Sequence, residues 1–390
     1  LCDPRMFTDA AAIDRAFKIL GIVQTRGAPG SLAREQATAL SRRLVPVERM
    51  AATPSEHGFG GSADATPQIL GPPLMLHAAP GVPPVILEQV IAVTEEFDES
   101  VSHMRHPSVR VLKDVFVNRL GQIWGRNGKA HRHFNRMIPA ESRQAEATAP
   151  VVEEAVLGVE THNNVYHWFA ECFLSLAWRL DDAASTIPIL IRENAARFVT
   201  ESLAMAATGP VPTVAAGDAV LVRRLHMAEA HLGTLARPEA VGPMLQRLRD
   251  RALAADADHA GAGQPLYISR RDSKNRPMNN EAALEEALVA RGFQAVTMTG
   301  RPLTEQIALV SGASCIVSAH GAGLALLATA APGRRVLEFV PALRGGMALR
   351  TCMAKISRIV GHEHHIWLQD TPAAGGTWSL ALDPVLTLVD

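Results

Sequence analysis

Near its C-terminal end the chain reads Ser314-Cys-Ile-Val-Ser-Ala-His320-Gly321-Ala322-Gly323-Leu324. A short run rich in β-branched residues ends at His320, and an apolar helical pattern begins directly after Gly323. Glycines leave backbone N–H groups open to a closely approaching ligand, and the start of a helix adds partial positive charge. The stretch therefore predicts a strand, a turn and a helix that together hold a phosphate. A tight turn without a ligand is the alternative.

The segments on both sides of this turn alternate between strand-like and helix-like patterns. Strands are predicted at 265–269, 293–297, 315–318 and 335–340, and helices at 280–291, 303–311 and 324–329. Regular alternation of this kind is typical of a parallel sheet with helices on both faces. Such sheets bind ligands beyond the carboxyl ends of their strands. We therefore predict an α/β, Rossmann-like ligand-binding domain over residues 265–370.

The loop after the first of these strands is basic. It contains Ser269, Arg270, Arg271, Ser273 and Lys274. Arginine binds phosphate through two parallel hydrogen bonds and lysine adds a point charge, so the loop suits a diphosphate. A solvated basic loop is the alternative.

A single carboxylate, Glu338, stands inside the apolar run Val336–Val340. Burying a carboxylate in a strand is costly unless it has a partner. Two ribose hydroxyls would be such a partner, as they are for the acidic residue of dinucleotide sites. Pairing with Arg334 or Arg335 is the alternative.

Residues 1–258 are predicted to form a first domain, of which 1–85 are partly irregular. Its strands are predicted at 83–93, 109–116, 156–160 and 186–191, and its helices at 163–178, 193–206 and 243–255. The helix at 163–178 would be capped by Asn163 or Asn164. Within it, His167 and Glu171 are four residues apart and therefore project from one face. The Ala- and Gly-rich stretch 256–264 is predicted to link the two domains.

Composition and charge exclude several classes of protein. The net charge of −1 argues against a nucleic-acid partner. The four cysteines form no CxxC pair, which fits a reducing compartment. No apolar run approaches the roughly 18 residues that span a bilayer. We therefore expect a cytoplasmic location, with peripheral association at the inner face of the membrane as a further expectation.

Two patterns have the residue types of metal sites. Asp256-Ala-Asp258 has the spacing of a metal-binding Asp-x-Asp, but it lies in the predicted linker rather than after an apolar strand. His362-Glu-His364-His365 offers zinc ligands, but it alternates like a strand, and we interpret it as a surface or cleft-edge strand. The sequence therefore predicts no metal site.

Several spaced motifs resemble, in order, those of the family 61 glycosyltransferases, over about residues 155–340. They are Asn164-Val-Tyr-His-Trp-Phe-Ala-Glu171, Tyr267-Ile-Ser-Arg270, Leu303-Thr-Glu-Gln-Ile-Ala308, Ser318-Ala-His-Gly-Ala-Gly-Leu324 and Val336-Leu-Glu338. The resemblance implies two Rossmann-type domains that face a cleft (the GT-B fold), with residues 371–390 packing back on the first domain. It also implies inverting transfer of a sugar from a nucleotide-sugar donor, with no cofactor and no obligatory metal.

The same resemblance implies roles for individual residues. Arg270 would meet the donor diphosphate, the turn His320–Gly323 the phosphates or the sugar, and Glu338 the ribose. His167 and Glu171 would stand across the cleft as candidates for the general base. The acceptor would be a glycan or a lipid-linked glycan in bacterial polysaccharide biosynthesis. A non-catalytic nucleotide-sugar-binding or scaffold protein is the alternative.

Overall fold

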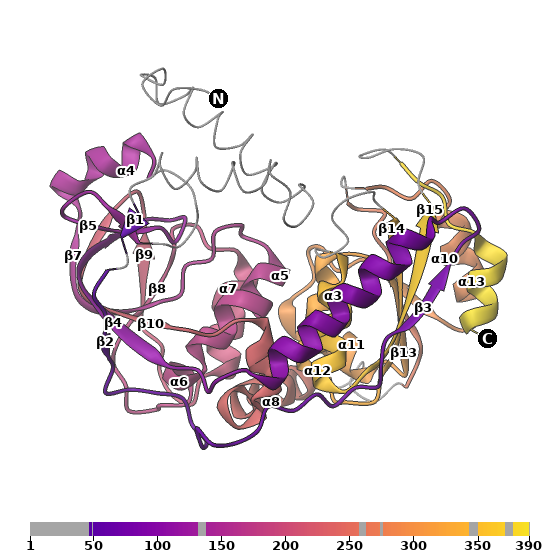
Figure 1. Ribbon diagram of the computed structural model, residues 1–390, viewed down its shortest axis with the longest axis horizontal. Helices are drawn as coiled ribbons and strands as arrows, with labels where there is room; N and C mark the ends of the chain where they lie inside the picture. Colours follow the sequence, from indigo (N-terminus) through magenta and orange to yellow (C-terminus); the bar gives the residue numbers. More distant parts are fainter. Residues whose placement is uncertain are drawn as a thin grey trace.

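The computed structural model describes residues 47–48, 50–131, 138–256, 263–273, 276–342, 350–370 and 377–389, with only the backbone described for 47–48. Two β-sheets lie side by side, with helices between them (Figure 1). Lys274 and Asp258, which the sequence analysis singled out, lie outside the described residues, as does most of the predicted linker.

The second sheet is entirely parallel. Its strands run in the order β12 (Gln294–Val296), β11 (Leu266–Ile268), β13 (Cys315–Ala319), β14 (Arg335–Ala342), β15 (Glu363–Asp370) and β3 (Met75–Ala78). Counted along the chain from β11, the first five follow the doubly wound order 2-1-3-4-5. Strand order reverses between β11 and β13, and such a switch point opens a crevice at the carboxyl ends of the strands. The parallel Rossmann-like sheet agrees with the alternation read from the sequence.

Helices connect the strands of this sheet. They are α10 (Glu281–Val289), α11 (Leu303–Gly312) and α12 (Cys352–Val360), and the segment η6 (Ala322–Thr329) is a 3-10 helix instead of the predicted α-helix. Six of the eight residues of η6 are buried. Its apolar character therefore reflects complete burial, which residue spacing alone does not distinguish from a one-sided α-helix.

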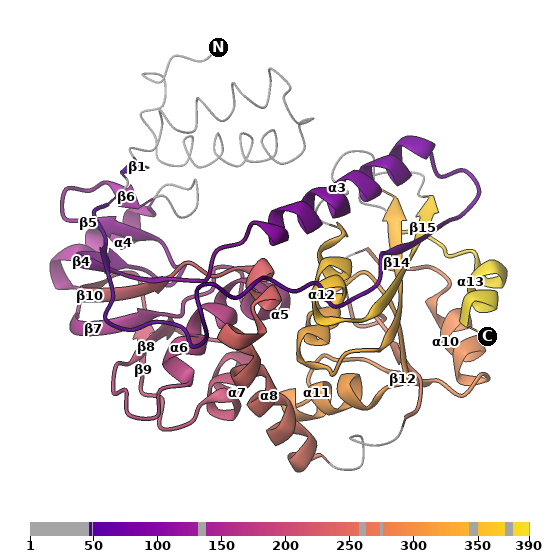
Figure 2. The same cartoon turned by 60° about the horizontal axis from the view of Figure 1, so that its bottom comes forward.

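The segment 75–102, placed with the first domain by the sequence, contributes to the second sheet. Strand β3 pairs with β15, and the predicted strand at 83–93 is wrong because α3 (Pro84–Ser102) occupies it. Pro84 at the first helical position and the burial of Ile86 and Val90, one turn apart, explain the helix. Figure 2 shows α3 extending from the second sheet toward the first.

The first sheet is mixed, unlike the doubly wound sheet expected. Its order is β1 (Val47–Glu48), β6 (Ala130–His131), β5 (Ile123–Gly125), β4 (Val109–Val117), β10 (Val220–Ala228), β7 (Val151–Leu157), β8 (Ile189–Arg192) and β9 (Thr213–Ala216), with β2 (Thr53–Pro54) beside β4. The half from β10 to β9 is parallel, as is the short pair of β1 and β6, and the pairs between them are antiparallel. The turn at 118–122 between β4 and β5 is too short for a crossover, so those strands are antiparallel.

Further helices pack between and around the sheets. They are α4 (Ala140–Ala145), η2 (Glu146–Thr148), α7 (Arg197–Ala206), η5 (Leu232–Ala236) and α8 (Pro238–Ala255). Helix α8 contacts α11 of the second sheet, and one hydrophobic cluster includes both Leu248 and Ile307. The two halves therefore share a continuous core. Among the described residues, no helix combines the length and apolar character that crossing a bilayer requires.

The C-terminal segment packs on the second half, not on the first as expected. Helix α13 (Leu382–Val389) lies against α10 (Figure 1). Trp378 and Val385 are buried in the same cluster as Leu284 of α10. The apolar face of the segment therefore covers the nearest helix of the second sheet, which is a local way to bury it.

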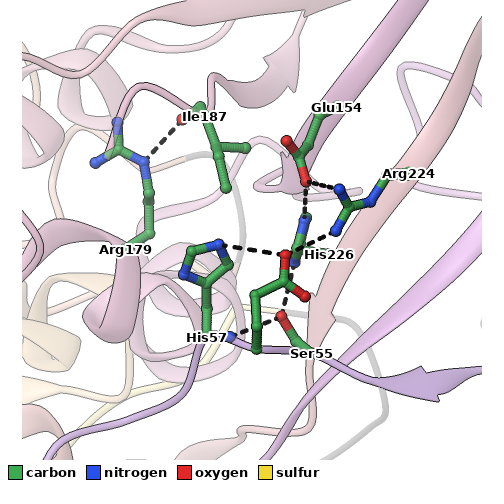
Figure 3. A network of polar contacts seen from close by, with 8 residues as sticks. Ser55, His57, Glu154, Arg179, Ile187, Arg224 and His226 are labelled. Carbon is green, nitrogen blue, oxygen red and sulfur yellow. Dashed lines mark hydrogen bonds and ion pairs between the residues drawn. The ribbon is translucent and has the colours of Figure 1, made fainter. Parts of the chain in front are cut away.

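A polar network attaches the segment after β2 to the first sheet (Figure 3). His226 on β10 is fully buried, and its Nε2 lies 2.8 Å from a carboxylate oxygen of Glu154 on β7. Since the carboxylate can only accept, Nε2 carries the hydrogen, and the Ser55 hydroxyl donates to Nδ1 at 3.0 Å. The His57 ring stacks on Trp178, with 5.5 Å between the ring centroids, so this segment also packs on an aromatic side chain.

Candidate functional site

The segment that carries His167 begins as predicted but is not one continuous helix. Asn164 caps it, because its side chain accepts a hydrogen bond from the Tyr166 N–H at 2.9 Å. A short α5 (Val165–His167) passes into a π turn, η3 (Trp168–Cys172), then η4 (Phe173–Leu176) and α6 (Ala177–Leu180). Trp168 is fully buried and donates to the Ser202 hydroxyl at 2.8 Å. Single π turns often occur at functional sites.

His167 and Glu171 interact directly across this π turn. His167 Nδ1 lies 2.8 Å from Glu171 Oε2. This hydrogen bond raises the pKa of His167, although burial acts in the opposite direction. Because the carboxylate accepts, Nδ1 carries the hydrogen, and in the neutral ring Nε2 presents a lone pair. The pair thus has the arrangement of an oriented imidazole whose second nitrogen is free to take a proton.

A buried carboxylate organises the loop after β11. Glu281, at the start of α10, accepts hydrogen bonds from the Tyr267 hydroxyl at 2.9 Å, the Ser269 hydroxyl at 3.2 Å and the Arg270 N–H at 2.5 Å. The Ser269 hydroxyl therefore stabilises the loop through Glu281, and the residue is only 3% exposed. Its neighbour Arg271 points to Glu285 at 2.7 Å and is largely exposed. Of the predicted residues that the structure describes in this loop, Arg270 is directed toward the turn after β13.

Arg270 lies across Gly321. Its guanidinium donates to the His320 carbonyl and to the Ser273 hydroxyl, the latter at 2.9 Å. A Cβ atom on Gly321 would meet Arg270 Cδ, Nε and Cζ at 3.1–3.3 Å. The glycine thus allows the arginine to approach closely, since a side chain there would push Arg270 away by a few tenths of an ångström. The sequence pattern did not reveal this role.

Two arginines that the sequence analysis did not select join Arg270. The charge of Arg276 lowers the pKa of Arg270, after burial, and the charges of Arg276 and Arg270 both lower the pKa of Arg350. Burial, followed by the nearby Arg276, lowers the pKa of Arg350 to about 10. Arg276 Nε and Arg350 Nη1 are buried and have no hydrogen-bond partner among the described residues. Buried donors without partners are rare, so the cluster has the properties of an anion site.

A sequence signal for these two arginines existed. Arg276 belongs to the polar loop after β11, and Arg350 follows β14. Loops after the carboxyl ends of parallel strands meet at one edge of the sheet. Every cation in such loops was therefore a candidate, whatever its distance along the chain from Arg270.

Glu338 is buried beneath His320. Its side chain is 0% exposed, with Oε1 2.6 Å from His320 Nδ1 and Oε2 3.1 Å from His364 Nε2. Burial alone would raise the pKa of Glu338, but the charge of His320 and the hydrogen bonds from both histidines lower it to about 2. The partners are therefore histidines, not Arg334 or Arg335, whose guanidinium groups donate to the carbonyls of Ser311 and Leu388.

We expect Glu338→Ala to lower the free energy of unfolding by about 3–5 kcal/mol, since it leaves two buried histidines without their shared acceptor. Urea denaturation measures this, and Glu363→Ala, an exposed carboxylate on the neighbouring strand, is the control. The folded-state pKa lies below the usual 4.5, so the stabilisation is complete above pH 4.5 and is lost as the pH falls toward 2. Equal stability of the two variants at pH 7 would contradict the prediction.

The structure brings the His167 segment to the second sheet. Helix α5 and the π turn η3 both contact η6, which directly follows the His320–Gly323 turn. Tyr166 interacts with Cys352 at the start of α12, two residues after Arg350; burial, then Cys352 and Glu171, raise its pKa. Elements separated by more than a hundred positions in the sequence therefore pack against one another next to the His320–Gly323 turn.

The histidine-rich strand differs from its interpretation as a surface or cleft-edge strand. It is β15, which lies between β14 and β3, so that His362, His364 and His365 are 0%, 2% and 6% exposed. Burial lowers the pKa of His362 to about 4, and its Nε2 lies 3.0 Å from the Leu327 carbonyl oxygen. The strand is covered because β3, from the distant segment 75–78, pairs with it.

Comparison with known proteins bears on this arrangement. Residues 165–337 match the model of the family Glycosyltransferase 61. The match includes His167, Glu171, Arg270 and the His320–Gly323 turn, and it ends one residue before Glu338. No curated protein matches the chain. The matched region thus includes both the imidazole–carboxylate pair and the switch point of the parallel sheet, and residues 165–337 match a family 61 glycosyltransferase domain.

Proposed function

We propose that this chain is an inverting glycosyltransferase that moves a sugar from a nucleotide-sugar to a hydroxyl of a glycan or lipid-linked glycan. The setting would be bacterial polysaccharide biosynthesis, in the cytoplasm or at the inner face of the membrane. The two halves would act as the domains of a GT-B enzyme, with residues 265–370 binding the donor. The carrying observation is the cluster of Arg270, Arg276 and Arg350 at the switch point of the sheet.

The proposal that this cluster binds the donor diphosphate is based on its positive charge. Burial lowers the pKa of each of the three arginines, so an added dianion would relieve their mutual repulsion. It would also give a partner to Arg276 Nε and Arg350 Nη1, which have none among the described residues. A diphosphate fits because arginine forks bind phosphate oxygens in pairs. As the leaving group gains charge during transfer, the same arginines would stabilise it. Positive charge fixed at this place supports transfer without an obligatory metal.

His320 and Glu338 would position the rest of the donor. Because His320 Nδ1 donates to Glu338, Nε2 is the ring nitrogen left for the donor substrate, as a hydrogen-bond donor when the ring is charged and as an acceptor when it is neutral. Glu338 itself is 0% exposed. In this proposal it acts on the ribose or the sugar through His320, rather than by the direct contact that the resemblance implied.

The acceptor side would use His167. Its Nε2 would take the proton of the attacking hydroxyl, while Glu171 holds the ring through Nδ1. The attack would come opposite the leaving nucleoside diphosphate, which is the geometry of inversion. The contacts of α5 and η3 with η6 support the placement of this imidazole beside the donor site.

A panel of UDP-, GDP- and CMP-sugars tests the proposal. Hydrolysis or transfer from one of them, with inverted anomeric configuration by NMR and unchanged activity in excess EDTA, is the expected outcome. Binding of the free nucleotides without turnover by any donor would favour the alternative of a non-catalytic nucleotide-sugar-binding protein. Absence of both binding and turnover would contradict the proposal.

We expect Gly321→Ala to weaken binding of nucleoside diphosphate about 10-fold or more, because the new methyl group displaces Arg270. Gly323→Ala is the matched control, since its Cβ would meet Met298 and Ile268 at an ordinary 3.5–3.6 Å. Titration calorimetry with UDP and GDP compares the two, and thermal unfolding checks that both remain folded. Equal losses in the two variants would count against the role of Arg270 in binding.

A further inference from the structure

A second group of side chains lies on the outer side of His167. The carboxylate of Glu160 and one ring nitrogen from each of His162 and His167 all lie within 4.8 Å of one another. The rings of His162 and His167 have centroids 4.2 Å apart. Two imidazoles and one carboxylate are the ligand set of many open transition-metal sites. None of the assigned roles uses Glu160 or His162.

The backbone holds this group in place. Glu160 is buried, and its two oxygens accept hydrogen bonds from the His162 N–H and from the Asn164 N–H, the latter at 3.0 Å. The carboxylate is therefore fixed by the turn that leads into α5. Each oxygen keeps a further lone pair, which is what a metal ion would take.

Glu171 orients His167 through the ring nitrogen that would not bind the metal. Metal-binding histidines usually present one nitrogen to the ion and donate from the other to a carboxylate, which fixes the ring. His167 has this geometry already, because Glu171 Oε2 lies 2.8 Å from Nδ1 and leaves Nε2 for a ligand. An exposed histidine, His162, stands on the open side and gives solvent access.

We propose that Glu160, His162 and His167 bind one Zn2+ ion, with Glu171 as the carboxylate that orients His167. Zinc bonds of about 2.0–2.2 Å in a tetrahedron require ligand atoms about 3.3–3.6 Å apart. The three groups lie within 4.8 Å of one another and would move closer together on binding the ion. The fourth position would remain open to water. The ion would take no part in the transfer reaction proposed above, which needs no metal.

The site has a consequence for transfer, and this step rests on the proposed function. Zinc bound to His167 Nε2 takes the lone pair that would accept the proton of the attacking hydroxyl. Bound zinc would therefore inhibit transfer instead of supporting it, and the site would act as a metal-sensitive switch on the acceptor side.

The test uses the full chain, freed of metal with a chelator and then titrated with Co2+ and Zn2+. We expect one Co2+ per chain with the strong visible absorption of tetrahedral cobalt, and displacement of that cobalt by Zn2+. His162→Ala should weaken zinc binding by at least about 100-fold, and Glu171→Ala by about 10–100-fold. His103→Ala, an exposed histidine after α3, is the matched control and should bind zinc as the wild type does.

Failure of the metal site is distinguishable from failure of the proposed function, because these titrations contain neither donor nor acceptor. Since His162 is exposed, His162→Ala is expected to fold, and circular dichroism checks this. Absence of tetrahedral cobalt absorption, or equal zinc affinity in His162→Ala and His103→Ala, would overturn the proposal. Zinc affinity lost in His162→Ala alone would support it.

Discussion

His167→Ala is expected to lower kcat for sugar transfer by about 10²–10⁴-fold, the usual contribution of a positioned general base. The variant loses the imidazole whose Nε2 faces away from Glu171, and no other group takes over the proton in the proposed mechanism. KM for the donor should change little, because the arginine cluster is untouched. Steady-state kinetics with the donor found in the sugar panel, in metal-free buffer, measures both constants.

Two substitutions of Glu171, which orients His167, distinguish an effect on catalysis from an effect on folding. Glu171→Gln keeps an oxygen that can accept from His167 Nδ1, so the loss in kcat should be smaller than in Glu171→Ala. A purely structural role would instead lower thermal stability together with activity in all three variants. The base assignment would be wrong if His167→Ala kept near-wild-type kcat with an intact fold.

Arg270→Ala should lower kcat/KM by about 10²–10³-fold, the cost typical of removing one group that stabilises developing negative charge. The side chain also donates to the His320 carbonyl, so its loss loosens the turn beside the donor. Arg270→Lys should recover only part of the loss, because an ammonium group cannot bind two phosphate oxygens as a fork. Titration calorimetry with UDP and GDP reports the ground-state share of the effect.

Arg271, the next residue in the sequence, provides a control for this prediction. Arg271 is adjacent in sequence but pairs with Glu285 and is largely exposed, so Arg271→Ala should cost far less than Arg270→Ala. Arg350→Ala, more than seventy residues away, should cost more than Arg271→Ala because Arg350 belongs to the cluster. Equal effects of Arg270→Ala and Arg271→Ala would reject the cluster as the donor site.

The local patterns predicted strands β11 to β14 of the second sheet, because each of these is short, largely apolar and bounded by turn residues. The patterns gave wrong predictions where a segment is buried on all sides or where it packs against a segment distant in the sequence. The 3-10 helix η6 is apolar on all sides, and α3 begins with a β-branched run that reads as a strand until its length is counted. The π turn at Trp168–Cys172 also has no signature in residue spacing, because Asn164 caps it as it would cap an ordinary helix.

The sequence by itself determined the parallel Rossmann-like sheet, the turn at His320–Gly323, and the side chains Arg270, His167 and Glu171 as candidates. Only the tertiary structure decided that Arg276 and Arg350 join Arg270, that His320 and His364 share Glu338, and that β3 covers β15. The physical reason lies in strand pairing. Parallel register brings the carboxyl ends of strands together at one edge, whatever the length of chain between them, and local sequence does not encode which distant side chains meet there.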